Sequence, residues 1–176
     1  MGKYDRSFLD EDFRRAVLAL LERAEEEAVV ITGEFSTLGY FQDLKAAVRD
    51  AIERGVRFRV YLTEENWGVL NRLLGWGCEV YLGEEPSKTH FLVIDNRNWM
   101  SSKEHPRKRI GVRSGEYRTG DPETALKLVA RFEELIRTAR RLEKPDWTKD
   151  PLAEFIGSPV DIGVETDSSR IDEELQ

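Results

Sequence analysis

The sequence is poor in the residues that build disulfides and metal centres. It contains one cysteine and two histidines among 176 residues, which excludes an intrachain disulfide and a cysteine metal site. No apolar run approaches the roughly 20 residues that a membrane-spanning helix needs, and Met1 to Arg6 lacks an apolar signal core. We therefore expect no metal, no cofactor and no membrane span, and a cytoplasmic location.

Charge, by contrast, is abundant. Charged residues make up 35% of the chain and apolar residues 40%, which is typical of one globular domain with a charged surface. The prevalence of Glu, Lys and Arg resembles thermophilic compositions. The net charge of −7 argues against a protein that coats nucleic acid non-specifically. Residues 103–118 are nevertheless net positive, whereas residues 145–176 are strongly acidic.

Hydrophobic periodicity predicts alternating helices and strands. Helical spacing of apolar residues, with Gly55, Gly75 and Gly77 as stops and Asp121 as an N-cap, predicts helices over 7–27, 40–54, 64–75 and 121–142. Short apolar or alternating runs predict strands over 28–33, 56–62, 78–82, 87–95, 99–101 and 110–113. This order predicts an α/β domain with a mainly parallel or mixed sheet and helices on both faces. Arg57 and Arg59 alternate with core residues and are expected at the surface.

The character of the chain changes at Lys144. Prolines and glycines interrupt any periodicity beyond this point, and the last residues are acidic and rich in serine. We expect a domain over residues 1–144 and an acidic tail over 145–176 that is partly disordered or binds a protein partner.

One stretch, Ser87 to Asp95, carries the candidate chemistry. Lys88 and His90 are two residues apart on a predicted strand, so their side chains share a face, and Asp95 follows the strand. A cation, an imidazole and a carboxylate so placed could bind or cleave a phosphate, or could be a solvated strand end.

The order of elements resembles the phospholipase D superfamily over residues 8–142. The resemblance rests on Arg54-Gly55-Val56, on Phe91-Leu92-Val93-Ile94-Asp95, and on the Asp121-Pro122-Glu123 helix with its Phe132-Glu133-Glu134-Leu135. In that family a His-x-Lys motif, followed after four residues by Asp, supplies a histidine nucleophile, a phosphate-neutralising lysine and a supporting aspartate. Two such motifs complete one active site, so the resemblance implies a homodimer for a chain with one.

This sequence departs from the motif at its decisive positions. Lys88 stands at the histidine position and His90 at the lysine position, and only Asp95 is retained. The family's Gly-Ser-x-Asn segment falls near Ser101 to Glu104, where glycine and asparagine are absent. A lysine is protonated near neutral pH and lacks a lone pair for attack, and two strand steps move the imidazole by roughly 6–7 Å. The exchanged positions of lysine and histidine therefore favour phosphate binding over catalysis.

Three functional hypotheses follow. The leading one is a catalytically degenerate domain that binds nucleic acid, a nucleotide or a lipid headgroup; its ligand-binding residues would be Lys88, His90, Ser101, Ser102, Lys103, Arg107, Lys108 and Arg109. The second is a metal-independent phosphodiesterase or endonuclease with His90 and Asp95 as catalytic residues. The third is an adaptor that works through the 145–176 tail. A metal site using His90 and His105 is formally possible, but His105 lacks ligand spacing. Trp67, Trp76 and Trp99 are expected to fill cores or subunit contacts rather than to stack on bases.

Overall fold

Nearly continuous apolar runs form the middle of the sheet because both of its faces are covered. The computed structural model describes residues 6–8, 10–33, 35, 42–85, 89–103 and 115–144. Its strands are β1 (Arg6–Phe8), β2 (Glu27–Thr32), β3 (Arg57–Leu62), β4 (Glu79–Leu82), β5 (Thr89–Ile94), β6 (Asn98–Lys103), β7 (Gly115–Arg118) and β8 (Arg140–Leu142). Its helices are α1 (Asp10–Glu22), α3 (Gln42–Glu53), α4 (Trp67–Trp76) and α5 (Pro122–Ile136).

The described strands form one mixed sheet in the order β1-β7-β6-β5-β2-β3-β4-β8. β2 pairs in parallel with β3, and β3 with β4. β5 lies antiparallel to β2 on the other side, and β6 and β7 continue the antiparallel part. The predicted α/β architecture is confirmed, with its parallel part confined to β2, β3 and β4.

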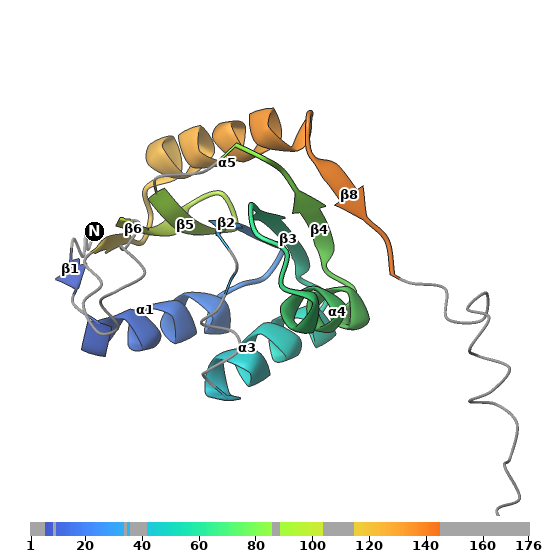
Figure 1. The fold of residues 1–176 in the computed structure, drawn as a ribbon. Coiled ribbons are helices and arrows are strands. Elements are labelled where there is room, and N and C mark those ends of the chain that lie inside the picture. Colours follow the sequence, from blue (N-terminus) through green and yellow to red (C-terminus); the bar gives the residue numbers. More distant parts are fainter. Residues whose placement is uncertain are drawn as a thin grey trace, which may run out of the picture. The chain divides into compact units, whose positions relative to one another are not determined.

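Helices cover both faces of the sheet (Figure 1), and an apolar layer lies between each face and its helices. On one face α1, α3 and α4 bury residues that include Leu20, Val48, Leu70, Val30, Val60 and Leu92. On the other, α5 buries Phe132 and Leu135 against residues that include Val29, Tyr61 and Val93. Successive strand residues alternate between the two layers, and this alternation decides which side chains meet at each end of the sheet.

Local signals in the sequence account for several helix ends. Asn66 caps α4 by accepting a hydrogen bond from the Val69 N–H, and Gly77 ends it at φ 93°, a left-handed conformation that suits glycine. Asp121 caps α5 in the same way by accepting from the Thr124 N–H. The predicted stop at Gly77 and the predicted cap at Asp121 are both confirmed.

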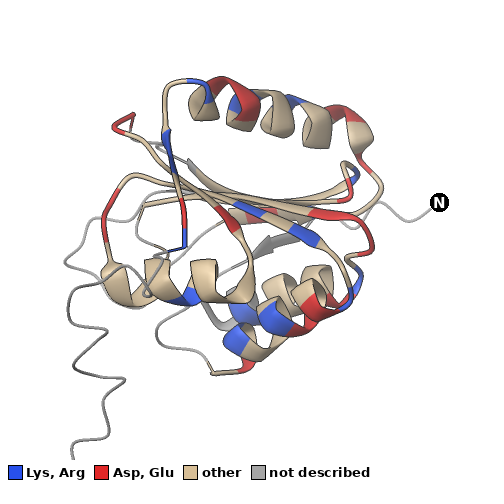
Figure 2. Ribbon diagram, turned by 90° about the vertical axis from the view of Figure 1, so that its right-hand side faces the viewer, with Lys and Arg blue, Asp and Glu red and all other residues tan. Residues whose placement is uncertain are grey.

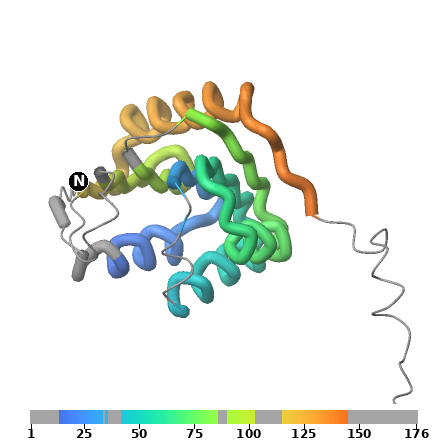
Figure 3. Tube along the Cα trace, viewed as in Figure 1, coloured from blue at the N-terminus to red at the C-terminus, as the bar shows by residue number. Residues whose placement is uncertain are grey.

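Two predicted elements differ from the structure, and a third lies outside the described residues. The first helix begins at Asp10, because residues 6–8 form β1 and pair with β7. The last helix ends at Ile136, and Arg140–Leu142 form β8 along β4 instead of continuing the helix. The strand predicted over 110–113 lies outside the described residues, and the strand seen in this part of the sheet is Gly115–Arg118. Figure 3 traces this path, with β8 beside β4.

The described residues all belong to the first of two units, Met1–Lys144; the second is Pro145–Gln176.

Acidic and basic residues are interspersed along α5 (Figure 2). Among the helices that the structure describes, none has the length and apolarity to cross a bilayer.

The single cysteine is predicted to be unreactive in the folded protein. Cys78 is buried in the helix-rich layer, and burial raises the pKa of its thiol to about 12, so the nucleophilic thiolate is scarce at neutral pH. We expect an aromatic disulfide reagent to label the native protein at least about 100-fold more slowly than the urea-unfolded chain, since labelling must await opening of the core. Equal labelling rates in the two states would contradict this placement.

Candidate functional site

His90 lies at the end of the sheet where the parallel strands finish. β5 runs antiparallel to β2, with Phe91 opposite Ile31, so the next pair outward is His90 and Thr32. The two side chains meet there, with 3.1 Å between His90 Nδ1 and Thr32 Oγ1. The half-buried imidazole is therefore held at the carboxyl edge of β2, the edge at which open α/β sheets bind ligands.

The turn that follows β3 is hydrogen-bonded to Gly33, the residue that follows β2. The N–H groups of Thr63 and Glu64, just after β3, donate to the Gly33 carbonyl at 3.0 and 3.2 Å. A Cβ on Gly33 would lie 3.5 Å from Glu64 Oε1, 3.9 Å from His90 Cε1 and 4.0 Å from Thr63 Oγ1. The position of the absent Cβ is thus bordered by an imidazole, a hydroxyl and a carboxylate at contact distance; we call this position the Gly33 notch.

The two predicted serines face different layers. Ser102 pairs with His90 across β5 and β6 and is buried. It shares the face of Met100, two residues away, which belongs to the layer under α1, α3 and α4. Ser101 pairs with Phe91, which belongs to the α5 layer. Only Ser102 is therefore brought to the face of His90, and the expectation that Ser101 contributes to the same site does not fit its orientation.

Of the predicted lysines and arginines, the structure describes Lys103 alone. Lys103 is the last residue of β6 and pairs with Thr89, the first residue of β5. In the sequence Lys88 directly precedes Thr89, but it lies outside the described residues. Arg107, Lys108 and Arg109 also lie outside them, as does His105.

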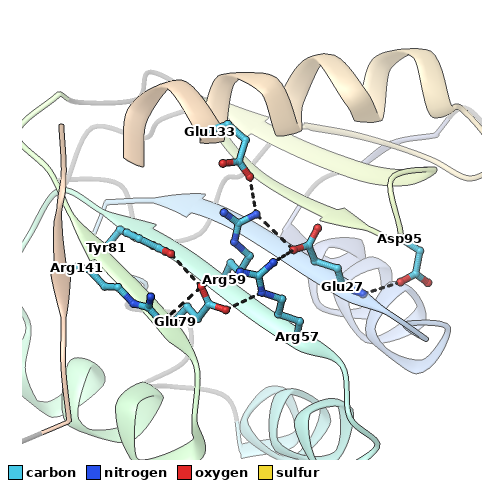
Figure 4. A network of polar contacts seen from close by, with 8 residues as sticks. All are labelled: Glu27, Arg57, Arg59, Glu79, Tyr81, Asp95, Glu133 and Arg141. Carbon is cyan, nitrogen blue, oxygen red and sulfur yellow. Dashed lines mark hydrogen bonds and ion pairs between the residues drawn. The ribbon is translucent and has the colours of Figure 1, made fainter. Parts of the chain in front are cut away.

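Asp95 lies at the opposite end of β5 from His90. Its carboxylate accepts hydrogen bonds from the backbone N–H groups of Glu25, Glu26 and Glu27 at 3.1, 2.8 and 2.9 Å. Figure 4 shows the contact with Glu27. Asp95 is five residue steps from His90 along the extended chain, a distance of about 16 Å. The expectation that Asp95 joins His90 in catalysis does not fit this position: the carboxylate anchors the start of β2.

The sequence did not single out three residues around His90 and Gly33, namely Thr32, Thr63 and Glu64. Thr32 lies in the strand predicted over 28–33, Glu64 begins the helix predicted over 64–75, and Thr63 falls between two predicted elements. Their position at the carboxyl ends of two parallel strands was the available signal. Their proximity to His90 depends on the register between β2 and β5, which no local pattern encodes.

A network of ion pairs covers the other face, at the start of the parallel strands (Figure 4). Arg59 Nη1 lies 2.6 Å from Glu133 Oε1 on α5 and 3.4 Å from Glu27 Oε1. Its guanidinium lies 4.7 Å from the centre of the Phe132 ring. The expectation that Arg59 is a surface residue is wrong, because α5 covers it and leaves it 6% exposed. Arg57 remains exposed, as expected.

Arg57 and Glu79 form a bidentate ion pair in this network. Arg57 Nε and Nη2 donate to the two carboxylate oxygens of Glu79 at 2.6 and 3.1 Å. This hydrogen bonding lowers the pKa of Glu79, although burial opposes the shift, and Tyr81 and Arg141 add to it. A depressed pKa means that the folded state stabilises the charged carboxylate.

We therefore expect the free energy of unfolding to fall in acid, partly because Glu79 becomes protonated. Its contribution is complete above the ordinary glutamate pKa and is lost as pH drops through the lower folded-state pKa. Replacing Glu79 with glutamine should cost about 0.5–1 kcal/mol at neutral pH, because Arg57 is well solvated, and less near pH 3, which lies below the ordinary glutamate pKa. Urea unfolding of both proteins at the two pH values measures this. An equal difference at both would show that the carboxylate charge is irrelevant.

The tryptophans differ in environment. Trp99 is buried and donates from Nε1 to Asp121 Oδ2 at 3.1 Å, and Trp76 packs against the helix-rich core, as expected for core residues. Trp67 is instead 52% exposed in the first turn of α4. Within the part of the chain that the structure describes, no three His, Cys, Asp or Glu side chains are grouped to hold a metal ion.

Solved structures with the same fold identify the architecture. No protein-family model matches the sequence, and no curated protein matches it. The chain is similar to Nuc, a phospholipase D family member from Salmonella typhimurium, with a TM-score of 0.67 and 13% identity over 81% of this chain and 99% of Nuc. It is also similar to NucT from Helicobacter pylori, with a TM-score of 0.59 and 14% identity over 80% of this chain and 100% of NucT.

A third similar structure is TrmBL2, an archaeal chromatin protein described with a novel mode of DNA binding. Its TM-score is 0.60, with 16% identity over 78% of this chain and 54% of TrmBL2. The chain therefore has a phospholipase D-like fold. The predicted resemblance to this superfamily is confirmed at the level of fold.

Proposed function

We propose that this phospholipase D-like domain binds a phosphate-bearing ligand at the carboxyl edge of β2 and β3, with little or no turnover. The observation that carries the proposal is the placement of His90 beside the Thr32 hydroxyl and the Gly33 notch. Hydroxyls and an imidazole at this edge are suitable partners for phosphate oxygens.

Positive charge in the sequence is concentrated around the same strand ends. Thr89 and Lys103 pair at the edge; Lys88 precedes the first, and Arg107, Lys108 and Arg109 follow the second within a few residues. Cationic side chains supply most of the affinity of proteins for phosphate backbones. We infer that these residues form the cationic rim of the site.

Weak or absent catalysis is supported by the exchange within the motif. Lys88 occupies the position of the nucleophile in the family that the chain resembles, and a protonated amine cannot attack phosphorus. His90, the remaining nucleophile candidate, is displaced from that position by two strand residues, or roughly 6–7 Å. In-line attack does not tolerate such a displacement.

Among phosphate-bearing ligands we favour nucleic acid. TrmBL2, which shares the fold, is a chromatin protein that binds DNA, and a net-positive segment within an acidic chain is typical of a localised nucleic-acid surface. We further propose that the chain forms a homodimer in which the carboxyl edges of β2 and β3 from the two copies meet. We expect this homodimer to act in the cytoplasm. A protein partner bound by residues 145–176 would be additional to the nucleic acid.

Binding of fluorescent single-stranded and duplex DNA at low salt tests the proposal. We expect affinity to fall steeply with added salt and to drop about tenfold or more in Lys88→Ala and in His90→Ala, since each removes a phosphate contact. Lys127→Ala is the matched control for the loss of a cation; Lys127 is exposed on α5 and pairs with Glu123. No binding at low ionic strength, or an equal loss in this control, would contradict the proposal.

Catalysis by His90 is the second candidate, favoured by the contact that orients its ring on Thr32. Metal-independent cleavage of a bis-aryl phosphodiester that disappears in His90→Ala would establish it. Cleavage that survives this substitution would exclude His90 as the nucleophile.

A further inference from the structure

Trp67 is an exposed aromatic residue near the edge of the sheet at which the ligand is proposed to bind. It is the first residue of α4, the helix that follows the carboxyl end of β3. Among the residues that the structure describes, Trp67 and Leu126 are the two large apolar residues that remain exposed, and Leu126 lies on α5, across the sheet from α4 (Figure 1). Core packing does not account for Trp67, because the buried face of α4 consists of Val69, Leu70, Leu73 and Leu74.

We propose that Trp67 stacks on a base of a single-stranded nucleic acid whose backbone is bound at the Gly33 notch. This inference rests on the proposed function and adds a contact with the base to the contacts with phosphate. Every base has a π-face that an aromatic ring can cover, so such a contact tolerates any sequence. Because the bases of a single strand are free to unstack from one another, the contact favours a single strand over a duplex.

Trp67 and His90 belong to the same side of the sheet. The His90 side chain shares the strand face of Leu92, two residues away, and Leu92 belongs to the layer under α1, α3 and α4. Thr63, whose Oγ1 borders the Gly33 notch, precedes Trp67 by four residues, so their Cα atoms are at most about 14 Å apart. Domains that bind single strands contact roughly 4–16 nucleotides, so a strand that leaves the notch toward α4 reaches Trp67 within such a site.

The first turn of α4 fixes the backbone of Trp67. The Asn66 side chain accepts a hydrogen bond from the Val69 N–H at 3.3 Å, and the Asn66 carbonyl accepts from the Leu70 N–H at 2.8 Å. An aromatic side chain on a rigid turn loses little conformational entropy when it binds. Within α4 the only charged residue is Arg72, so no carboxylate of this helix repels a phosphate backbone.

An oligothymidylate and an abasic strand of the same length form a matched pair of probes. The abasic strand keeps the sugar–phosphate chain and lacks the bases, so it reports the binding of phosphate alone. Fluorescence anisotropy at low salt would give both dissociation constants for the wild type, Trp67→Ala, Trp67→Phe and Leu126→Ala. Thermal unfolding verifies that each variant is folded, and sedimentation velocity measures its self-association.

We expect Trp67→Ala to weaken the binding of the oligothymidylate about tenfold, as for the loss of one stack between a base and an aromatic ring. The same variant should bind the abasic strand within about twofold of the wild type. Trp67→Phe retains an aromatic face and should recover most of the loss, whereas Leu126→Ala should bind both strands as the wild type does.

If both strands bind the wild type and Trp67→Ala changes neither dissociation constant, or changes both equally, the stacking role is overturned and the proposed function stands. A change in self-association alone would also overturn it and would assign Trp67 to a contact between copies of this chain. If neither strand binds the wild type at low ionic strength, both the stacking role and the proposed function are overturned.

Discussion

Replacing Asp95 with alanine is expected to lower the free energy of unfolding by about 3 kcal/mol, because a buried carboxylate that accepts several hydrogen bonds is lost. The side chain is 5% exposed, and its two oxygens accept from three consecutive N–H groups at the start of β2. Alanine would leave these donors without their acceptor. Asp95 also has φ 51°, a conformation that Asp and Asn tolerate better than alanine.

Urea unfolding measures this loss, and Asp95→Asn separates its two causes. Asparagine retains one acceptor oxygen and tolerates the backbone conformation, so it should recover part of the stability. Asp50→Ala, which removes an exposed carboxylate on α3, should change stability by less than about 0.5 kcal/mol. A loss for Asp95→Ala as small as that of the control would contradict an anchoring role.

The same variant separates anchoring from participation in the site. Because Asp95 is about 16 Å from His90, folded Asp95→Ala protein should bind DNA as the wild type does under conditions where both remain native. Loss of binding with intact folding would instead place Asp95 in the ligand site.

Replacing Arg59 with alanine is expected to cost about 2–3 kcal/mol, below the range for fully buried pairs because one partner is solvated. The substitution removes the cation shared by Glu27 and Glu133 and the packing against Phe132. Glu133 is 43% exposed, so water can replace its lost partner. Burial, the largest single influence, tends to lower the pKa of Arg59, but the hydrogen bond and charge of Glu133 together with the charge of Glu27 outweigh it and raise the pKa, so the residue stays charged.

Arg59→Met distinguishes the charge from the packing. Methionine keeps much of the contact with Phe132, and apolar replacements of buried ion pairs are often close to neutral. We therefore expect Arg59→Met to lose less than half of what Arg59→Ala loses in urea unfolding. Equal losses would assign the stability to the charge, and no loss in either variant would contradict the tight packing of α5 on β3.

The sequence predicted those parts of the fold that depend on local chemistry. Apolar runs located the central strands, and Asp121 and Gly77 marked helix ends, because caps and periodicity act within a few residues. β8 was missed because Arg140–Leu142 continues the charged and apolar spacing of α5. Only pairing with β4, which is distant in the chain, makes these residues a strand.

The sequence predicted only part of the site, because the rest depends on contacts between strands that are distant in the chain. His90 could be singled out from its motif-like setting, but the roles of its neighbours depend on pairing between strands. The antiparallel register of β5 on β2 joins His90 to Thr32 and carries Asp95 to the far end. Likewise, alternation along β3 could not show that α5 would cover Arg59.

An NMR titration of the isotopically labelled protein with a short single-stranded DNA would show whether a phosphate-bearing ligand binds at the Gly33 notch. We expect salt-sensitive shifts concentrated at the amides of Thr32, Gly33, Thr63, His90 and Ser102, with α5 almost unaffected. Shifts confined to α5 or to residues 145–176, or no shifts at low ionic strength, would contradict binding at the notch.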